Sequence, residues 1–470
     1  MEKVLLSVAE LTEKMSGFSH TYHLVDVHHD RDSYYAIDEE SYMKPETYMC
    51  LNGYLLNLIM DGELEKARKF LNSLPDADMY KFLKIGMEIV FPAVTWAQFI
   101  NDIKFLKQIN FVMPNVVLTA GRPSILNGFN DFSRLGPILT KNKDVFIDHL
   151  KYLYEYPSCN SIYNVCLAEY YYQRDKVLDA EVLISRTIKE FNNDSERRLL
   201  FASLYIQVKV LLAQGKNVDS ESYITSVRNY VKENGKAEFS YNINAAEVML
   251  SLYEGKREVI ANWMNTDAPD EFGDFCMLDL YRYMVKIRCY IINQKYTAVV
   301  ALAEKLRPLL EEGRRRMDLC ELDLLLAINF YRAKEKELSF EALERALKLI
   351  RRHKYYRLLA DEGEAIFYLL IDYMKEKGES DFLMMLIEKT RRMAINYPLY
   401  LKPQYKNETF SQMEIDILKL LEQGKQKEDI AECFFISVNT VKYHLKNIYS
   451  KLDAGTATQA VWEARVMGII

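Results

Sequence analysis

The chain has 470 residues, of which only 17 are Gly and 11 are Pro, about half of the roughly 12% that these residues contribute to average proteins. So few turn residues argue against sandwiches, barrels and propellers, which need Gly or Pro at most corners. The chain is 49% hydrophobic and 27% charged, with a net charge of −6. This composition predicts a packed, mostly helical protein and excludes one that coats nucleic acid with its whole surface.

The seven cysteines are scattered and form no CxxC pair, a pattern typical of reduced thiols rather than of a disulfide framework or zinc ribbon. No apolar run reaches the ~18 residues that a membrane span requires. The first residues carry acids where a signal peptide needs apolar side chains. We therefore expect a cytoplasmic protein with no membrane segment.

Residues 1–39 are predicted to form an N-terminal helical segment, and they contain four of the seven histidines. His20 and His23 are spaced to share a helix face, where imidazoles can bind a transition metal. His28 and His29 follow in the same segment. Because no family pattern accompanies them, we expect surface histidines and no metal or other cofactor.

Six short polar breaks interrupt the helical patterning of the middle of the chain. Their central residues lie at nearly constant intervals of 39 to 42 residues: Arg174, Gly215, Gly255, Gln294, Glu335 and Lys377. Small residues flank several breaks, as Ala168, Ala180, Ala327, Ala342 and Ala346 do, and small side chains let paired helices approach closely. The pattern predicts a solenoid of helical hairpins over residues 40–400. It resembles tetratricopeptide (TPR) repeats and leaves its inner surface for a ligand or partner.

Other parts of this array allow two interpretations. Residues 115–132 contain Pro, Gly and Ser, and we expect a long loop there. The tyrosines at 152, 154, 156 and 170–172 either stack on an effector or fill hairpin cores. Residues 345–357 either bind an anionic effector or complete a helix C-terminus, where the helix dipole favours cations. Their cations are Arg345, Lys348, Arg351, Arg352, Lys354 and Arg357.

Pro398, Pro403 and a polar run mark the end of the array, and residues 401–407 are predicted to be a linker. Four helices are expected in residues 408–470. The first begins at a capping box of Ser411 and Glu414 and ends at Gly424, and the second spans residues 427–434. Ser437 can cap the third helix. Thr456 and Gln459 form the capping box of the fourth.

The third helix of this domain has two distinct faces. One face is apolar and carries Val441, Leu445, Ile448 and Leu452. The opposite face is polar and free of acids, and it carries Asn439, Lys442, Tyr443, Lys446 and Ser450. Lysines contact phosphates or guanine and Asn contacts adenine. The sequence therefore predicts that this helix enters a DNA major groove.

At this point the C-terminal domain resembles the LuxR-type helix-turn-helix domain of bacterial transcription regulators. The resemblance rests on Phe410–Glu414, Gly424, Asp429–Ala431 and above all Ile436–Leu452. It implies a four-helix fold, double-stranded DNA as partner and a homodimer formed through the helix Ala457–Met467. The implied DNA contacts are Ser437, Asn439, Thr440, Lys442, Tyr443, Lys446 and Asn447, with Lys451 as a contact to the DNA backbone.

Three positions depart from the pattern of that family. Met413 and Ala457 replace arginines that are usual there, and Gln426 replaces a capping serine. Residues 408–470 contain seven basic and nine acidic residues, a difference of −2. We therefore expect weak non-specific DNA binding that depends on the third helix and on paired half-sites.

The preceding region resembles the large MalT-like regulators at Ala120–Phe132 and Leu359–Glu364. In that family a helical-repeat sensor arm precedes the same DNA-binding domain, usually with an ATPase at the N-terminus. The chain has no Gly-x4-Gly-Lys-Ser/Thr motif, so we expect no phosphate-binding loop.

The resulting prediction is an all-α, non-enzymatic transcription regulator, expected to be an activator. A small molecule or protein bound to the array would control it, and RNA polymerase is a further expected partner. The alternative is a repeat scaffold whose helix-turn-helix has lost DNA binding and serves as a docking module; the charge of −2 and Ala457 favour this alternative.

Overall fold

The computed structural model describes residues 5–16, 22–77, 80–81, 83–84, 101, 104–105, 108, 122–128, 131, 140, 159–191, 199–216, 220–233, 240–402, 410–452, 454–466 and 469–470. In this part of the chain the secondary structure is helical, with one isolated bridge between Asn127 and Asp131 and no strand, which confirms the predicted all-α fold. None of the helices described is long and apolar enough to span a membrane. The chain divides into two compact units, residues 1–290 with 296–400, and residues 291–295 with 401–470.

The N-terminal helices pack around one central helix. This helix is α4 (Tyr48–Met60), in which ten residues are buried, as expected for a helix that is apolar on all sides. The hydrophobic core around α4 contains residues from both sides of position 39, the predicted boundary between the N-terminal segment and the array. The elements around it are α1 (Val8–Ser16), α2 (Tyr22–His29), α3 (Arg31–Tyr35), the 3-10 turns η1 (Ser41–Met43) and η2 (Pro45–Thr47), and α5 (Leu64–Ser73).

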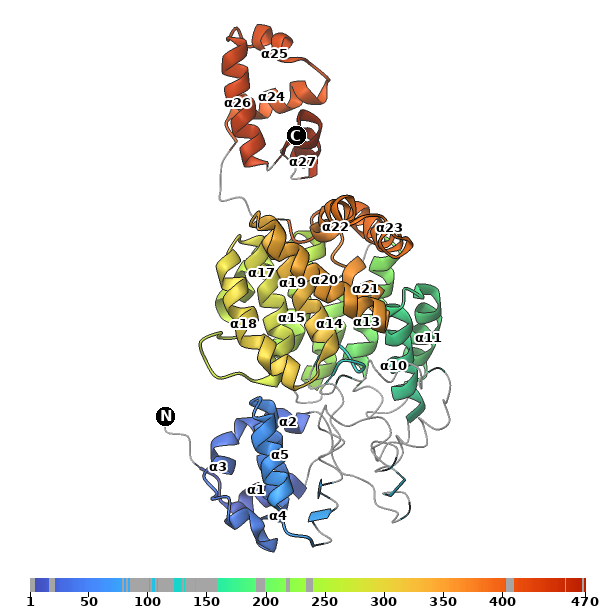
Figure 1. Ribbon diagram of the computed structural model, residues 1–470, viewed down its shortest axis with the longest axis vertical. Helices are drawn as coiled ribbons and strands as arrows, with labels where there is room; N and C mark the ends of the chain where they lie inside the picture. Colours follow the sequence, from blue (N-terminus) through green and yellow to red (C-terminus); the bar gives the residue numbers. More distant parts are fainter. Residues whose placement is uncertain are drawn as a thin grey trace. The chain divides into compact units, whose positions relative to one another are not determined.

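The repeat region consists of helix pairs joined by short turns (Figure 1). Five of the six predicted breaks fall between the two helices of one pair, and the sixth, at Lys377, coincides with the last residue of α22. This agreement confirms the helical-hairpin architecture. The pairs are α10 (Cys159–Gln173) and α11 (Val177–Lys189), α13 (Leu200–Ala213) and α14 (Ser220–Glu233), α15 (Ser240–Glu254) and α16 (Arg257–Thr266), α17 (Leu280–Ile292) and α18 (Tyr296–Glu312), α19 (Arg316–Arg332) and α20 (Lys336–His353), and α22 (Glu364–Lys377) and α23 (Asp381–Asn396). The short helices η5 (Met277–Asp279) and α21 (Tyr356–Ala360) precede α17 and α22.

The turn of each of the first five pairs contains one residue in the left-handed conformation. This residue ends the first helix, because the next amide then bonds back to a carbonyl five residues earlier. The amide of Lys176, for example, donates to the carbonyl of Tyr171 at 2.9 Å. The left-handed residues lie 39 or 40 positions apart: Asp175, Gly215, Gly255, Gln294 and Lys334.

The helices of each pair pack closely where the sequence supplies small residues. Ala168, Ala180, Ala327, Ala342 and Ala346 are all completely buried. A larger side chain at these positions would force the helix axes apart. The predicted role of these alanines in close packing therefore agrees with their burial.

The segment predicted as a long loop is anchored inside the array. Its described residues, 122–128 and 131, are not helical, but Arg122 is buried and donates to the Asp318 carboxylate at 2.8 Å. Arg315 donates to the same carboxylate at 2.6 Å. Burial alone would raise the pKa of Asp318, but the two guanidinium groups hold it at about 2. This segment is thus fixed to α19 by a buried ion network.

The C-terminal unit contains four helices around a small core (red in Figure 1). They are α24 (Gln412–Glu422), α25 (Lys427–Cys433), α26 (Val438–Lys451) and α27 (Ala457–Val466). The predicted capping box of Ser411 and Glu414 is present at the start of α24. The predicted linker at 401–407 lies outside the described residues from position 403 onward, and its bounds stay a prediction.

Candidate nucleic-acid interface

Helix α26 is fixed in the C-terminal unit by its apolar face. Val441 and Ile448 are completely buried, and Leu445 and Leu452 are nearly so. The preceding turn places Phe435 in the left-handed conformation, with φ of +52°. The amide of Ile436 then donates to the carbonyl of Ala431 at 3.0 Å. This turn joins α25 to α26 and leaves the opposite face of α26 free of contacts with its own core.

The outward face of α26 carries four of the predicted DNA contacts. Asn439, Lys442, Tyr443 and Lys446 are exposed, and Tyr443 is 63% exposed. Within the described part of the chain, neither Lys442 nor Lys446 forms an ion pair. Their ammonium groups therefore remain available for phosphates or guanine bases.

The N-terminal end of α26 is organised by two further predicted contacts. The Ser437 hydroxyl accepts a hydrogen bond from the Thr440 amide at 3.1 Å. The two hydroxyl oxygens also lie 2.8 Å apart, within hydrogen-bond distance. Ser437 therefore caps the helix as predicted. Asn447 is half-buried further along the helix.

Lys451 differs from the other predicted contacts because it is already paired. Its ammonium donates to the Glu414 carboxylate at 2.8 Å and lies over the Phe410 ring, and its side chain is only 18% exposed. Burial would raise the pKa of Glu414, but bonds from Lys451 and Ser411 lower it below its usual value. Lys451 thus connects α26 to the start of α24.

Sequence analysis did not identify Phe435 as a functional residue. Its side chain is 96% exposed, in the turn immediately before the polar face of α26. An exposed aromatic ring of this size is suited to contact with a partner molecule. Whether a single turn residue is buried or exposed cannot be deduced from the local sequence. The exposure of Phe435 was therefore not predicted.

The departures from the family pattern have visible local consequences. Gln426 precedes α25, and its backbone N–H donates to the Asp429 carboxylate at 3.1 Å. An acid at the third helical position thus supplies the half of a capping box that does not depend on the side chain at position 426. Met413 is half-buried against the core of the unit.

Helix α27, the predicted dimer helix, has a buried and an exposed side. Ala460 and Ala464 are completely buried in the core of their own unit, whereas Trp462 is 43% exposed. Glu463 pairs with Lys402, whose ammonium also lies over the Trp462 ring. Met467 lies outside the described residues. The exposed side of α27 is therefore the part available to a second copy.

Two of the six cations in the candidate effector segment, residues 345–357, form ion pairs within the array. Arg345 pairs with Asp323, and Arg357 pairs with Asp361 and Asp175. The cations of residues 345–357 include Arg351 and Arg352, which lie in the last turn of α20. These contacts favour the helix-end interpretation of the cations.

Two of the described tyrosines and one described histidine also have internal surroundings. Tyr170 and Tyr172 are buried, and the Tyr172 hydroxyl donates to the Asp361 carboxylate at 2.9 Å. His28 lies 3.2 Å from the Asp61 carboxylate. The side chain of His23 is not described, and His20 and residues 152–156 lie outside the described residues.

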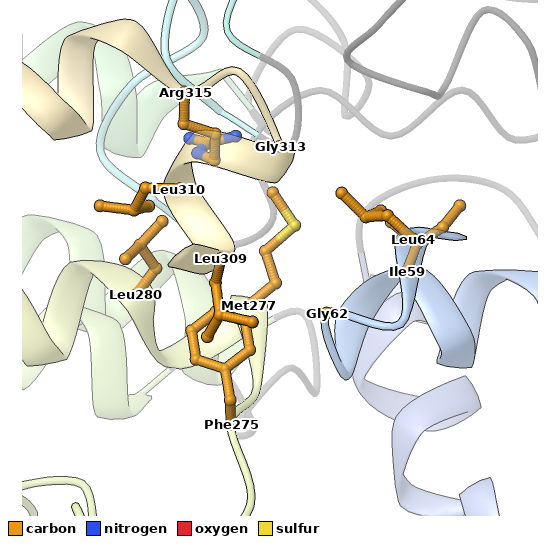
Figure 2. A pocket seen from close by; sticks show the side chains of 10 residues that line it. All are labelled: Ile59, Gly62, Leu64, Phe275, Met277, Leu280, Leu309, Leu310, Gly313 and Arg315. Atoms are coloured by element: carbon orange, nitrogen blue, oxygen red, sulfur yellow. The ribbon is translucent and has the colours of Figure 1, made fainter. Parts of the chain in front are cut away.

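A small cavity of about 30 Å³ lies between the α4–α5 turn, the start of α17 and the connection from α18 to α19. Figure 2 shows Ile59, Gly62 and Leu64 on one side and Leu309, Leu310 and Phe275 on the other. A water needs roughly 10–15 Å³ of such space, so the cavity is too small for a metabolite. An open groove of about 810 Å³ lies between α11 and α23.

An array of helical hairpins with a terminal four-helix unit of this geometry defines a helix-turn-helix DNA-binding protein with a repeat domain. Comparison with known families agrees. Residues 158–376 match the MalT-like TPR region, and residues 408–464 match the luxR family of bacterial regulatory proteins. The chain therefore combines a MalT-like TPR region with a luxR-family DNA-binding domain, and both predicted resemblances are confirmed. Neither match is to an ATPase domain.

Proposed function

We propose that this DNA-binding regulator binds specific operators by inserting α26 into the major groove. The supporting observation is the exposed, acid-free face of α26, where Asn439 is exposed and where Lys442 and Lys446 form no ion pair with any described residue. Ser437, Thr440, Tyr443 and Asn447 complete the surface, with the amide-rich N-terminus of the helix directed to phosphate. Lys451 contributes by orienting α26, and a direct contact would require it to leave Glu414.

Useful affinity requires two copies of the domain. Residues 408–470 carry a charge difference of −2, so a single domain has little general attraction to DNA. We propose a homodimer that forms through the exposed side of α27 around Trp462 and binds two half-sites about one helical turn apart. Activation of transcription would then follow from contact with RNA polymerase, for which the exposed Phe435 ring is a suitable surface.

The repeat array serves as the control domain in this proposal. Helical solenoids use their extended inner surface to bind ligands or proteins, and the array precedes the DNA-binding unit directly in the chain. We propose that an effector on the array changes how the DNA-binding units pair. Both matched families are non-enzymatic in general, and we propose no catalytic role. A cytoplasmic location would suit this function.

Selection of bound sequences from a random duplex pool by the full-length chain tests the proposal. Enrichment of a paired motif is expected, and an Asn439→Ala variant should lose preference at one base position in each half-site while retaining overall binding. The alternative function, a docking module that no longer binds DNA, predicts no enrichment and no salt-dependent duplex binding. That result would overturn the proposed function.

A further inference from the structure

The C-terminal end of the array crosses the turns of the first three hairpins in order. We call residues 389–400 the strap. Lys389 on α23 pairs with Asp175 in the first turn. The Tyr397 hydroxyl donates to the carbonyl of Lys216 in the second turn at 3.0 Å. The Tyr400 ring stacks on Tyr253, next to the third turn, with ring centres 4.4 Å apart.

The residue types in the turns match this path. A Cβ atom on Gly215 would lie 2.5 Å from the Asn396 side chain, and one on Gly255 would lie 2.9 Å from the Leu399 side chain. The equivalent left-handed positions in the fourth and fifth turns hold Gln294 and Lys334. Glycine thus occurs at the second and third turns, where strap side chains pass closely, whereas the first turn holds Asp175, the partner of Lys389.

The far end of the strap is fixed in a buried ion network. Tyr400 is 1% exposed; its hydroxyl donates to Glu362 at 2.9 Å and accepts from Arg288 at 3.0 Å. Arg288 also pairs with Glu321 at 2.7 Å. Arg288 and Glu362 also pair with each other, so removing Tyr400 would take one hydrogen bond from each of these buried charged groups and leave a gap in their network. This weakening of a shared network favours concerted rather than local loosening.

We propose that the strap is a clamp that holds the first three hairpins at fixed spacing and couples them to the segment leading to the DNA-binding unit. A change in hairpin spacing then alters strap contacts, and release of the strap lengthens the connection to the DNA-binding unit. Through the clamp, a change in the array can affect the DNA-binding unit. This regulatory role of the clamp rests on the proposed function. The clamp itself is testable without DNA.

Hydrogen exchange of the full chain tests the coupling between the two ends of the strap. Tyr400→Ala removes the far end, and it is expected to raise exchange about tenfold at the amides around Asp175 and Gly215. Tyr331→Ala is the control, because Tyr331 bonds to Asp372 and not to the strap. Faster exchange confined to the neighbours of residue 400, with the first two turns unchanged, would overturn the clamp.

A milder pair of variants keeps the test decisive if Tyr400→Ala fails to fold. Asn tolerates the left-handed conformation, so Gly255→Asn perturbs mainly the contact with Leu399, whose Cβ lies 3.3 Å from the added carbon. Lys334→Asn is the control, because it places Asn at the equivalent left-handed position of the fifth turn, for which the described residues show no strap contact. Faster exchange of residues 397–402 is expected only for Gly255→Asn; equal exchange in the two variants would refute the clamp.

Duplex binding by the same variants separates the two proposals. If the wild-type chain binds its operator, Gly255→Asn should change the affinity more than threefold and Lys334→Asn should not. An unchanged affinity would refute the coupling to DNA binding. If the wild-type chain binds no duplex, the proposed function fails, and the exchange results still decide whether the clamp exists.

Discussion

The unpaired lysines of α26 lead to a quantitative prediction about salt. Replacing Lys442 and Lys446 together by Ala removes two exposed cations that form no ion pair within the described residues. Each phosphate that a lysine neutralises contributes about −0.9 to the slope of log affinity against log salt. The double variant should therefore have a slope less steep by about two units.

The same relation gives the size of the effect in a simple experiment. A rise from 50 to 200 mM salt weakens each phosphate contact about 3.5-fold, so two contacts account for about 12-fold of the wild-type loss. Operator duplex titrated by fluorescence anisotropy at four salt concentrations measures this difference. The effect should be independent of the operator sequence if both lysines contact phosphate.

A control with the same change in charge separates local contact from general attraction. Lys419→Ala with Lys425→Ala removes two exposed lysines outside α26. This control should keep most of the wild-type slope. The reasoning is refuted if the two double variants reduce the slope equally, because charge alone would then explain the binding.

Two further predictions concern stability. Asp318→Asn leaves two buried guanidinium groups without their anion, so the free energy of unfolding should fall by about 3–5 kcal/mol, measured by denaturant unfolding of the full chain. Glu65→Gln, which breaks an exposed ion pair, is the control. A loss for Asp318→Asn no larger than that of the control would argue against the prediction. Because the pKa of Glu414 is lowered in the folded state, its stabilisation is present at neutral pH and is lost as pH falls through that lowered pKa. Lys451→Met should make the hydrogen-exchange protection of α24 and α26 less dependent on acid. Equal acid-dependent losses of protection in the variant and the wild type would contradict the role of Lys451 in lowering the pKa of Glu414.

The hairpins could be predicted because their determinants are local. A polar break after an apolar helix indicates a left-handed turn residue, and Gly215, Gly255 and Gln294 have this conformation. The apolar face of α26 follows in the same way from a spacing of 3.6 residues per turn. Burial of Val441 and Ile448 was therefore deducible from the sequence alone.

The remaining features depend on residues far apart in the sequence. Lys451 and Glu414 are 37 positions apart, and only the folded domain brings them together. The pairing of Lys389 with Asp175 spans 214 positions, so no local pattern indicates the strap. The sequence predicted the surface of α26, whereas the structure was needed to distinguish the paired Lys451 from the unpaired Lys442 and Lys446.

The strap also affects how the protein folds. A linear repeat array is held together by contacts between neighbours, so it can assemble stepwise and its end repeats can open independently. Contacts between Lys389 and Asp175 cannot form until nearly the whole array has been synthesised, and closing such a large loop is slow. The first hairpins therefore reach their final stability only shortly before the DNA-binding unit is translated. Once closed, the array should unfold as a single cooperative unit instead of fraying from its C-terminal end.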